Sequence, residues 1–149
     1  MRKNGYPRLD GSILTFLQVI WRLEHAVERA SKRMEDTIGI SGPQRFALRL
    51  IGHHPGLGAG ELAGSMHLHP STVTGMIQRL EGRGYVRRVA DPTDGRRMHL
   101  HLTPAGMRVT RARPTIEHAV QTTLSQCPAA KQRAAADLLD RFSRELMKL

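Results

Sequence analysis

Polar side chains gather on one predicted helix near the middle of this 149-residue chain, and their types suit contact with a nucleic acid. The helix is predicted to begin at Pro70 and to end at about Arg83. Val73, Ile77 and Leu80 lie at positions i, i+4 and i+7, so they form one buried stripe. The side chains left on the other side are Ser71, Thr72, Thr74, Gln78 and Arg79. Hydroxyl, amide and guanidinium groups are the ones that bind phosphates and base edges, although the same residues are also ordinary on a solvated helix face.

The segment before this helix predicts how the polar face is held. Residues 61–66 form a short predicted helix, and His67, Leu68 and His69 form a turn. Two short helices joined by such a turn, the second with a polar outward face, constitute the helix-turn-helix arrangement. Ala63 suits the close crossing of the two helices because its side chain is small.

A two-stranded hairpin is predicted directly after the helix pair. Residues 85–90 are β-branched and basic, and residues 98–102 alternate apolar side chains with histidines, which is the period of a strand. The Asp-Pro-Thr-Asp-Gly sequence of residues 91–95 is a strong turn signal. Gly95 is expected to give this turn a positive φ. A basic hairpin next to a helix-turn-helix describes a wing.

Arginines make the wing a second candidate contact. Arg96 and Arg97 lie at its tip, and an arginine in a narrow minor groove gains from the negative potential there. Arg87, in the first strand, is expected beside the DNA backbone. The alternative is a basic hairpin exposed only to water.

Amphipathic helices are predicted on both sides of this central region. Apolar residues recur at three- and four-residue steps from Ile13 to Met34. Ser41 is the expected cap of the next helix, whose inward residues are predicted to be Phe46, Leu50 and Ile51. From about residue 105 the chain is mostly helical, with breaks at Pro114 and around residues 126–128.

Composition restricts the class of protein. Lys and Arg number 23 against 13 Asp and Glu, a formal net charge of +10, which predicts a polyanionic partner. The single cysteine, Cys127, cannot form an intramolecular disulfide, and the polar, basic N-terminus has no signal-peptide core. We therefore expect a soluble cytoplasmic protein without a membrane partner. A phosphate-binding glycine loop, a nucleophile elbow and paired carboxylates are all missing from the sequence, so we expect no enzyme.

In order and spacing, five segments resemble the signature of the MarR family of transcription regulators. They are Glu61-Leu62-Ala63, Pro70-Ser71-Thr72-Val73-Thr74, Gln78-Arg79-Leu80-Glu81 with Gly84, Asp91-Pro92-Thr93-Asp94-Gly95-Arg96-Arg97, and Leu102-Thr103-Pro104-Ala105-Gly106. The resemblance implies a mainly α fold with a small two-stranded β wing, in one MarR-like domain over residues 1–149. The winged helix-turn-helix lobe would occupy about residues 40–104, and dimerisation helices about residues 12–38 and 105–149.

The resemblance also implies roles for individual residues. Arg96 matches the family's wing arginine and Asp94 its orienting partner, while Gly75 stands where the family often has a long, frequently basic side chain. Many members release DNA when a small molecule binds near the junction of the dimer and the lobe, where Trp21, His25 and Phe46 are candidates. The eight histidines form no legible metal site, and no cofactor is expected.

Together these features predict a sequence-specific DNA-binding regulator. It would be a homodimer that binds a palindromic site in double-stranded DNA, and a repressor released by a small-molecule effector. The alternative is an architectural DNA-binding protein without sequence preference, for which positive charge alone suffices.

Overall fold

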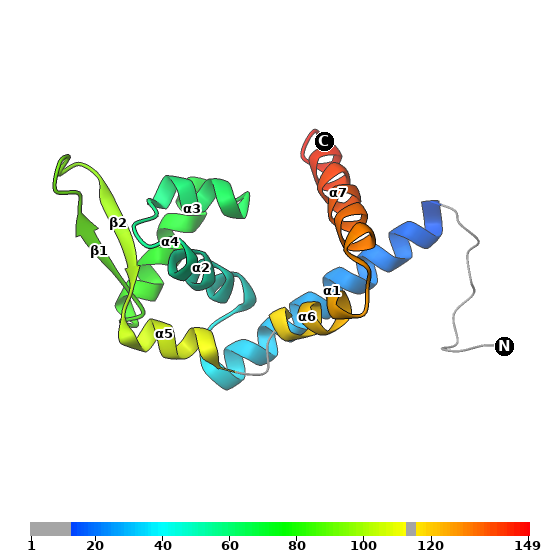
Figure 1. Cartoon of the computed structure of the whole chain (residues 1–149), viewed down its shortest axis with the longest axis horizontal. Helices are drawn as coiled ribbons and strands as arrows, with labels where there is room; N and C mark the ends of the chain where they lie inside the picture. The colour runs from blue at the N-terminus through cyan, green and yellow to red at the C-terminus, as the bar shows by residue number, and fades with distance from the viewer. Residues whose placement is uncertain (1–12, 113–115) are drawn as a thin grey trace. The chain divides into compact units, whose positions relative to one another are not determined.

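The computed structural model of the chain describes residues 13–112 and 116–149 (Figure 1). The chain divides into two compact units, Met1–Ala112 and Arg113–Leu149. The first unit contains α1 (Ile13–Ile38), α2 (Gly42–His53), α3 (Ala59–Met66), α4 (Pro70–Gly82), β1 (Val86–Ala90), β2 (Met98–Leu102) and α5 (Pro104–Arg111), and the second contains α6 (Ile116–Ser125) and α7 (Ala129–Leu146). The predicted fold class, mainly helical with a two-stranded wing, is confirmed.

The core of the first unit forms around α4. Val73, Ile77 and Leu80 are fully buried, as the stripe predicted, and Met76 joins them. They pack in one apolar cluster with α2, α3 and both strands. Ala63 is buried where α3 meets α4, and the turn between these helices contains a left-handed residue, His67, with φ of 52°. The predicted helix-turn-helix is therefore present.

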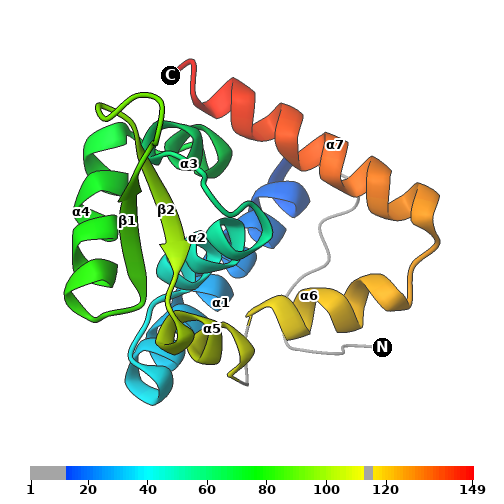
Figure 2. The same ribbon diagram turned by 60° about the vertical axis from the view of Figure 1, so that its left-hand side comes forward.

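The wing is an antiparallel hairpin that packs beside α4 (Figure 2). Its register pairs Val86 with Leu102 and Ala90 with Met98. The segment between α2 and α3 extends the sheet at the free edge of β2. There, the backbone N–H of Leu100 donates to Leu57 O (3.0 Å), and the N–H of Gly56 donates to Leu100 O (3.1 Å). This added edge attaches the wing to the core.

Helix α2 begins as predicted, and of its three predicted inward residues Phe46 alone faces outward. The Ser41 hydroxyl accepts from the Gln44 N–H, and the Gln44 side chain accepts from the Ser41 N–H, a reciprocal cap. The prediction that Phe46 faces inward is wrong, since its side chain is 49% exposed. Ile51 is buried as predicted and Leu50 packs against the core, and Ala47 and Leu48 are buried as well. At about 3.6 residues per turn, Phe46 lies on the outer face, away from Ala47 and Leu48.

A buried arginine connects α2 to the end of α5. The guanidinium group of Arg45 donates to the carbonyl oxygens of Val109 (2.7 Å), Thr110 (2.7 Å) and Ala112 (3.0 Å). These carbonyls lie where α5 ends, and Val109 O also accepts from the Ala112 N–H (3.2 Å). A cation is favourable there because the C-terminal end of the helix dipole is negative. The sequence offered no signal for this long-range contact.

The long helix α1 and the helices of the second unit expose many apolar side chains. In α1 only Met34 is buried, and the Ser31 hydroxyl near its end accepts from the Gly42 N–H (2.8 Å). In α7, Leu138, Leu139 and Leu146 are each about half exposed. The predicted break near residues 126–128 separates α6 from α7, whereas Pro114 lies outside the described residues. No helix among residues 13–112 and 116–149 has the length and apolar character needed to cross a bilayer.

Gly106 provides a test of how α5 packs on the wing. A Cβ atom at this position would lie 2.1 Å from the Tyr85 carbonyl oxygen, which also accepts from the Thr103 N–H. Because backbone cannot yield as a side-chain tip can, we expect Gly106→Ala to lower the free energy of unfolding by about 2–3 kcal/mol in urea denaturation.

Gly64 is the matched control. It lies within α3, and nothing lies within 4 Å of the Cβ atom it would gain. Gly64→Ala should therefore stabilise the protein, by up to about 1 kcal/mol, through helix propensity alone. Equal midpoints for wild type and Gly106→Ala would contradict the close approach of α5 to Tyr85.

Candidate nucleic-acid interface

The outward face of α4 is polar over its whole length. Because its apolar stripe is buried in the lobe, the side chains of all five predicted contact residues are exposed, namely Ser71, Thr72, Thr74, Gln78 and Arg79. The structure thus brings together on one helix the hydroxyl, amide and guanidinium groups that the sequence singled out.

Two of the hydroxyls on this face already take part in local hydrogen bonds. Thr74 Oγ1 donates its proton to Pro70 O (2.9 Å), so it keeps lone pairs and a methyl group but no proton for a phosphate. Ser71 Oγ lies 2.7 Å from Nδ1 of His69, and this ring nitrogen also accepts from the Ser71 N–H and caps the helix. Gln78 and Arg79, further along the helix, are consequently the stronger candidates for direct readout.

Arg96 and Arg97 lie exposed at the wing tip. Asp94 contacts both, in different ways. Its Oδ1 accepts from the backbone N–H of Arg96 (3.1 Å), whereas Oδ2 lies 3.6 Å from Nε of Arg97. The carboxylate therefore orders the backbone at Arg96, and its ion pair is with the neighbouring guanidinium of Arg97.

Asp91 organises the wing loop, a role that the sequence analysis missed. Its Oδ1 accepts from the Thr93 N–H (2.7 Å), the Thr93 hydroxyl (2.6 Å) and the Asp94 N–H (3.1 Å). These bonds, with the Thr93 hydroxyl first, and the one from His99 hold the pKa of the Asp91 carboxyl well below its usual range. The prediction of a positive φ at Gly95 is wrong, because the turn is closed by this side chain. In the sequence, the Asp-Pro-Thr-Asp pattern of residues 91–94 could have indicated this role of Asp91.

The other arginines of this region have different surroundings. Arg87 is exposed on β1, in register with His101. Arg88 forms an ion pair with Glu81 of α4 (3.0 Å), and Arg83 donates to the carbonyl oxygen of Gly39. Arg87 is thus an exposed arginine of the wing, and its place beside the DNA backbone stays a prediction.

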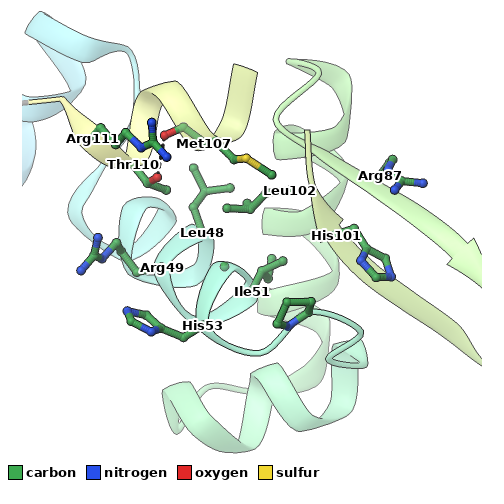
Figure 3. A pocket seen from close by; sticks show the side chains of 12 residues that line it. Leu48, Arg49, Ile51, His53, Arg87, His101, Leu102, Met107, Thr110 and Arg111 are labelled. Atoms are coloured by element: carbon green, nitrogen blue, oxygen red, sulfur yellow. Dashed lines mark hydrogen bonds between the residues drawn. The ribbon is translucent and has the colours of Figure 1, made fainter. Parts of the chain in front are cut away.

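A cavity of about 440 Å³ lies between α2, β2 and α5 (Figure 3). Leu48, Leu102 and Met107 supply aliphatic surface at its centre, with Arg49, His53 and Arg111 on one side and Arg87 and His101 on the other. The remaining lining residues are Ile51, Gly52, Pro55 and Thr110. An apolar floor with three arginines at the rim, Arg49, Arg87 and Arg111, suits an organic molecule that carries negative charge.

The predicted effector residues lie elsewhere. Trp21 and His25 are exposed on α1, and Phe46 on the outer face of α2, and none of the three lines this cavity. Over the part of the chain that the structure describes, three or more potential metal ligands do not converge at any point. Cys127 is a free, partly buried thiol between α6 and α7.

Comparisons with known proteins agree with this geometry. The model of the MarR family matches residues 40–98. A putative transcriptional regulatory protein for the hcr operon of Thauera aromatica is 33% identical over 95 residues, which are 64% of this chain and 55% of that relative. The chain spans a little over half the length of the curated relatives it matches first.

Solved structures resemble the chain over more of its length. The PcaV transcriptional regulator from Streptomyces coelicolor, in complex with its natural ligand, is 29% identical with a TM-score of 0.70, covering 95% of this chain and 98% of PcaV. Staphylococcus aureus MepR in complex with DNA shares the fold at 22% identity with a TM-score of 0.70, covering 89% of this chain and 98% of MepR. With the winged helix-turn-helix described above, these matches show that residues 40–98 match the MarR family and that the chain shares its fold with transcriptional regulators.

Proposed function

We propose that this protein is a sequence-specific DNA-binding transcriptional regulator. The observation that carries the proposal is the division of α4 into two faces: Val73, Ile77 and Leu80 are fully buried, whereas Gln78 and Arg79 are exposed. A helix with one face in the core can place its other face in a major groove, where amide and guanidinium groups discriminate base pairs. The arginine-tipped wing supplies the second contact.

The net charge of +10 supports the same partner, double-stranded DNA. Cations on the lobe release counterions from the phosphate backbone, and this supplies affinity without sequence preference. Base contacts from α4 then add discrimination. The solved complex of MepR with DNA, whose fold this chain shares, is consistent with that arrangement.

Exposed apolar surface supports the proposal of a homodimer. Apolar side chains follow α1 in the first unit and α7 in the second, and monomeric proteins rarely expose such continuous patches. The most exposed of them on α1 are Ile13, Leu14 and Trp21. We propose that residues 12–38 and 105–149 form the dimer and that the lobe of residues 40–104 binds DNA. Two symmetry-related lobes require a palindromic site.

Sequence preference separates this proposal from the architectural alternative. Selection of bound duplexes from a random pool should yield a palindromic site, preferred over random duplex by about 10³-fold or more. An architectural protein would enrich no site. Transcription from a promoter that carries the selected site would then decide between repression, which we propose, and activation.

A small-molecule effector completes the proposal. PcaV, the ligand-bound regulator to which this chain is similar, supports a small-molecule partner. Two places in the chain are candidates: the cavity beside Leu102 and Met107, and the exposed side chains of Trp21, His25 and Phe46. The cavity has the more complete wall.

The wing and the helix make separable predictions for DNA binding. Arg96→Ala should weaken binding to the selected site and to random duplex alike, and lower the slope of log affinity against log salt concentration by about one, since one cation that displaces counterions from the DNA is lost. Fluorescence anisotropy at several salt concentrations measures both. An unchanged affinity at moderate salt would remove the wing from the interface.

Gln78→Ala should act differently from Arg96→Ala. It removes an amide without changing net charge, so the salt slope should stay constant while the selected sequence changes at one or two positions. Identical selected sites for wild type and variant would show that Gln78 reads no base.

Lys148→Ala, at the C-terminal end of the chain, is the matched charge control for Arg96→Ala.

Two substitutions test the candidate effector sites: a larger side chain that fills the cavity, and a smaller one that removes the exposed aromatic group at Trp21. Met107 is half exposed and lines the cavity, so Met107→Trp should block it without altering the face of α4. With a compound that releases the wild type from DNA, Met107→Trp should stay bound and Trp21→Ala should still be released. The reverse pattern would place the effector at Trp21.

A further inference from the structure

The side chain of His99 joins the wing loop to the connection between α2 and α3. Its Nε2 lies 2.7 Å from Oδ2 of Asp91, in the loop, and its Nδ1 lies 2.5 Å from the carbonyl oxygen of Gly56. The ring is about a third exposed and the Asp91 side chain less than a fifth, so the contact is partly shielded from water. His99 is therefore the middle member of a bridge whose partners lie 43 residues from it in sequence, at Gly56, and 8 residues from it, at Asp91.

The chemistry of the two partners specifies the protonation state that the bridge needs. A backbone carbonyl and an ionised carboxylate both accept hydrogen bonds and have no proton to give. A neutral imidazole carries one N–H group, so it can donate to only one of them. Only the imidazolium form of His99 donates to Gly56 O and Asp91 Oδ2 at the same time.

Both ends of the bridge are firmly held. Asp91 is the residue whose other carboxylate oxygen accepts three hydrogen bonds from Thr93 and Asp94, so its position sets the conformation of the loop. Gly56 has φ of 92°, a region that favours glycine, and its N–H is bonded to Leu100 O. A change in the position of the His99 ring would therefore shift Asp91, and with it the loop that presents Arg96 and Arg97.

We propose that protonated His99 is a positioning residue for the wing, and that loss of its proton frees the wing loop and weakens DNA binding as the pH rises. The inference rests on the proposed DNA-binding function. Neither His99 nor Asp91 need touch DNA, because both act through the placement of the arginines at the wing tip.

The surroundings of the ring favour the charged form. The hydrogen bond to Asp91 and then the one to Gly56 raise the pKa of His99 above its ordinary value of 6.5, and Glu61 of α3 adds a favourable negative charge. Other titratable groups near members of the bridge in sequence are His101, two residues after His99 on β2, and His54, two residues before Gly56 at the end of α2. Val89 of β1, which pairs with His99, is apolar.

The sign of the pH dependence follows from the raised pKa of His99. Its contribution is complete below its ordinary value of about 6.5 and disappears as the pH rises through the higher folded-state pKa. The pKa of Asp91 is lowered, so its contribution is present above its ordinary value of 3.8 and is lost only in stronger acid. Between neutral and mildly alkaline pH, His99 is the member of the bridge that titrates.

The first measurement uses the free full-length protein and needs no variant. NMR titration of the His99 ring should give a midpoint above 6.5, and the amide signals of Thr93 and Asp94 should shift with the same midpoint. A midpoint at or below the ordinary value, or loop amides that ignore the titration, would overturn the inference. Because no DNA is present, this result does not depend on the proposed function.

The second measurement follows affinity for the selected duplex from about pH 6 to about pH 9 at constant salt. Wild type should lose affinity several-fold at the midpoint found by NMR. His99→Gln, which cannot become charged, should bind several-fold more weakly at the acid end and lack that step. His54→Gln removes a nearby titratable ring outside the bridge and should keep the step.

The outcomes separate the inference from the proposed function. A step of equal size in wild type and His99→Gln would show that another group titrates, and would overturn the role of His99 while leaving DNA binding intact. If no duplex is selected by wild type at any pH, the proposed function fails, and the positioning role fails with it even where the NMR titration shows the bridge.

Discussion

Burial of one stripe of α4 is the interaction on which the rest of this structure depends. Each fully buried side chain of Val73, Ile77 and Leu80 contributes about 1.5–3 kcal/mol relative to exposure, so rotation of the helix about its axis would be costly. This constraint determines which side chains face outward. The hydroxyl, amide and guanidinium groups of α4 lie together on the outer face because the apolar opposite face must be buried in the core.

The wing is positioned by a different kind of interaction. Few apolar contacts hold its loop, and hydrogen bonds to a single carboxylate, Asp91, hold it instead. The added backbone pairing at Leu100 and the ring of His99 then attach the hairpin to the α2–α3 connection. Because His101 and Leu102, which line the cavity, follow His99 on the same strand, β2 joins the candidate ligand site to the wing.

Local patterns in the sequence predicted most of the elements. The stripe of α4, the cap at Ser41 and the strand over residues 98–102 each depend on neighbours within a few positions, and each is confirmed, although Met98 at the start of that strand is exposed. The failure at Gly95 is local, because the Asp91 side chain closes the turn, whereas the failure at Phe46 involves contacts between distant segments. Phe46 satisfied the helical spacing for a core residue, but α2 turned Ala47 and Leu48 inward, and nothing local to the sequence distinguishes the two faces.

The candidate site shows the same division. The polar residues of α4 could be named from spacing alone, because burial of the apolar stripe leaves them exposed by necessity. Arg45 and the bridge through His99 could not, since their partners are backbone carbonyls 43 to 67 residues away, and a carbonyl has no side-chain identity to recognise. The Asp91 turn could be predicted in part: the sequence of residues 91–95 indicated the turn, but nothing in it indicated the hydrogen bond from His99.

Site-directed photo-crosslinking in the complex with a selected duplex tests the central claim most directly. A photoreactive residue in place of Gln78 should crosslink to a base within the palindrome, and one in place of Arg96 should crosslink beside it, while one in place of Glu24 on α1 should give no crosslink to DNA. Crosslinking from position 24 with none from positions 78 and 96 would contradict the account, because the outward face of α4 would then lie away from the duplex.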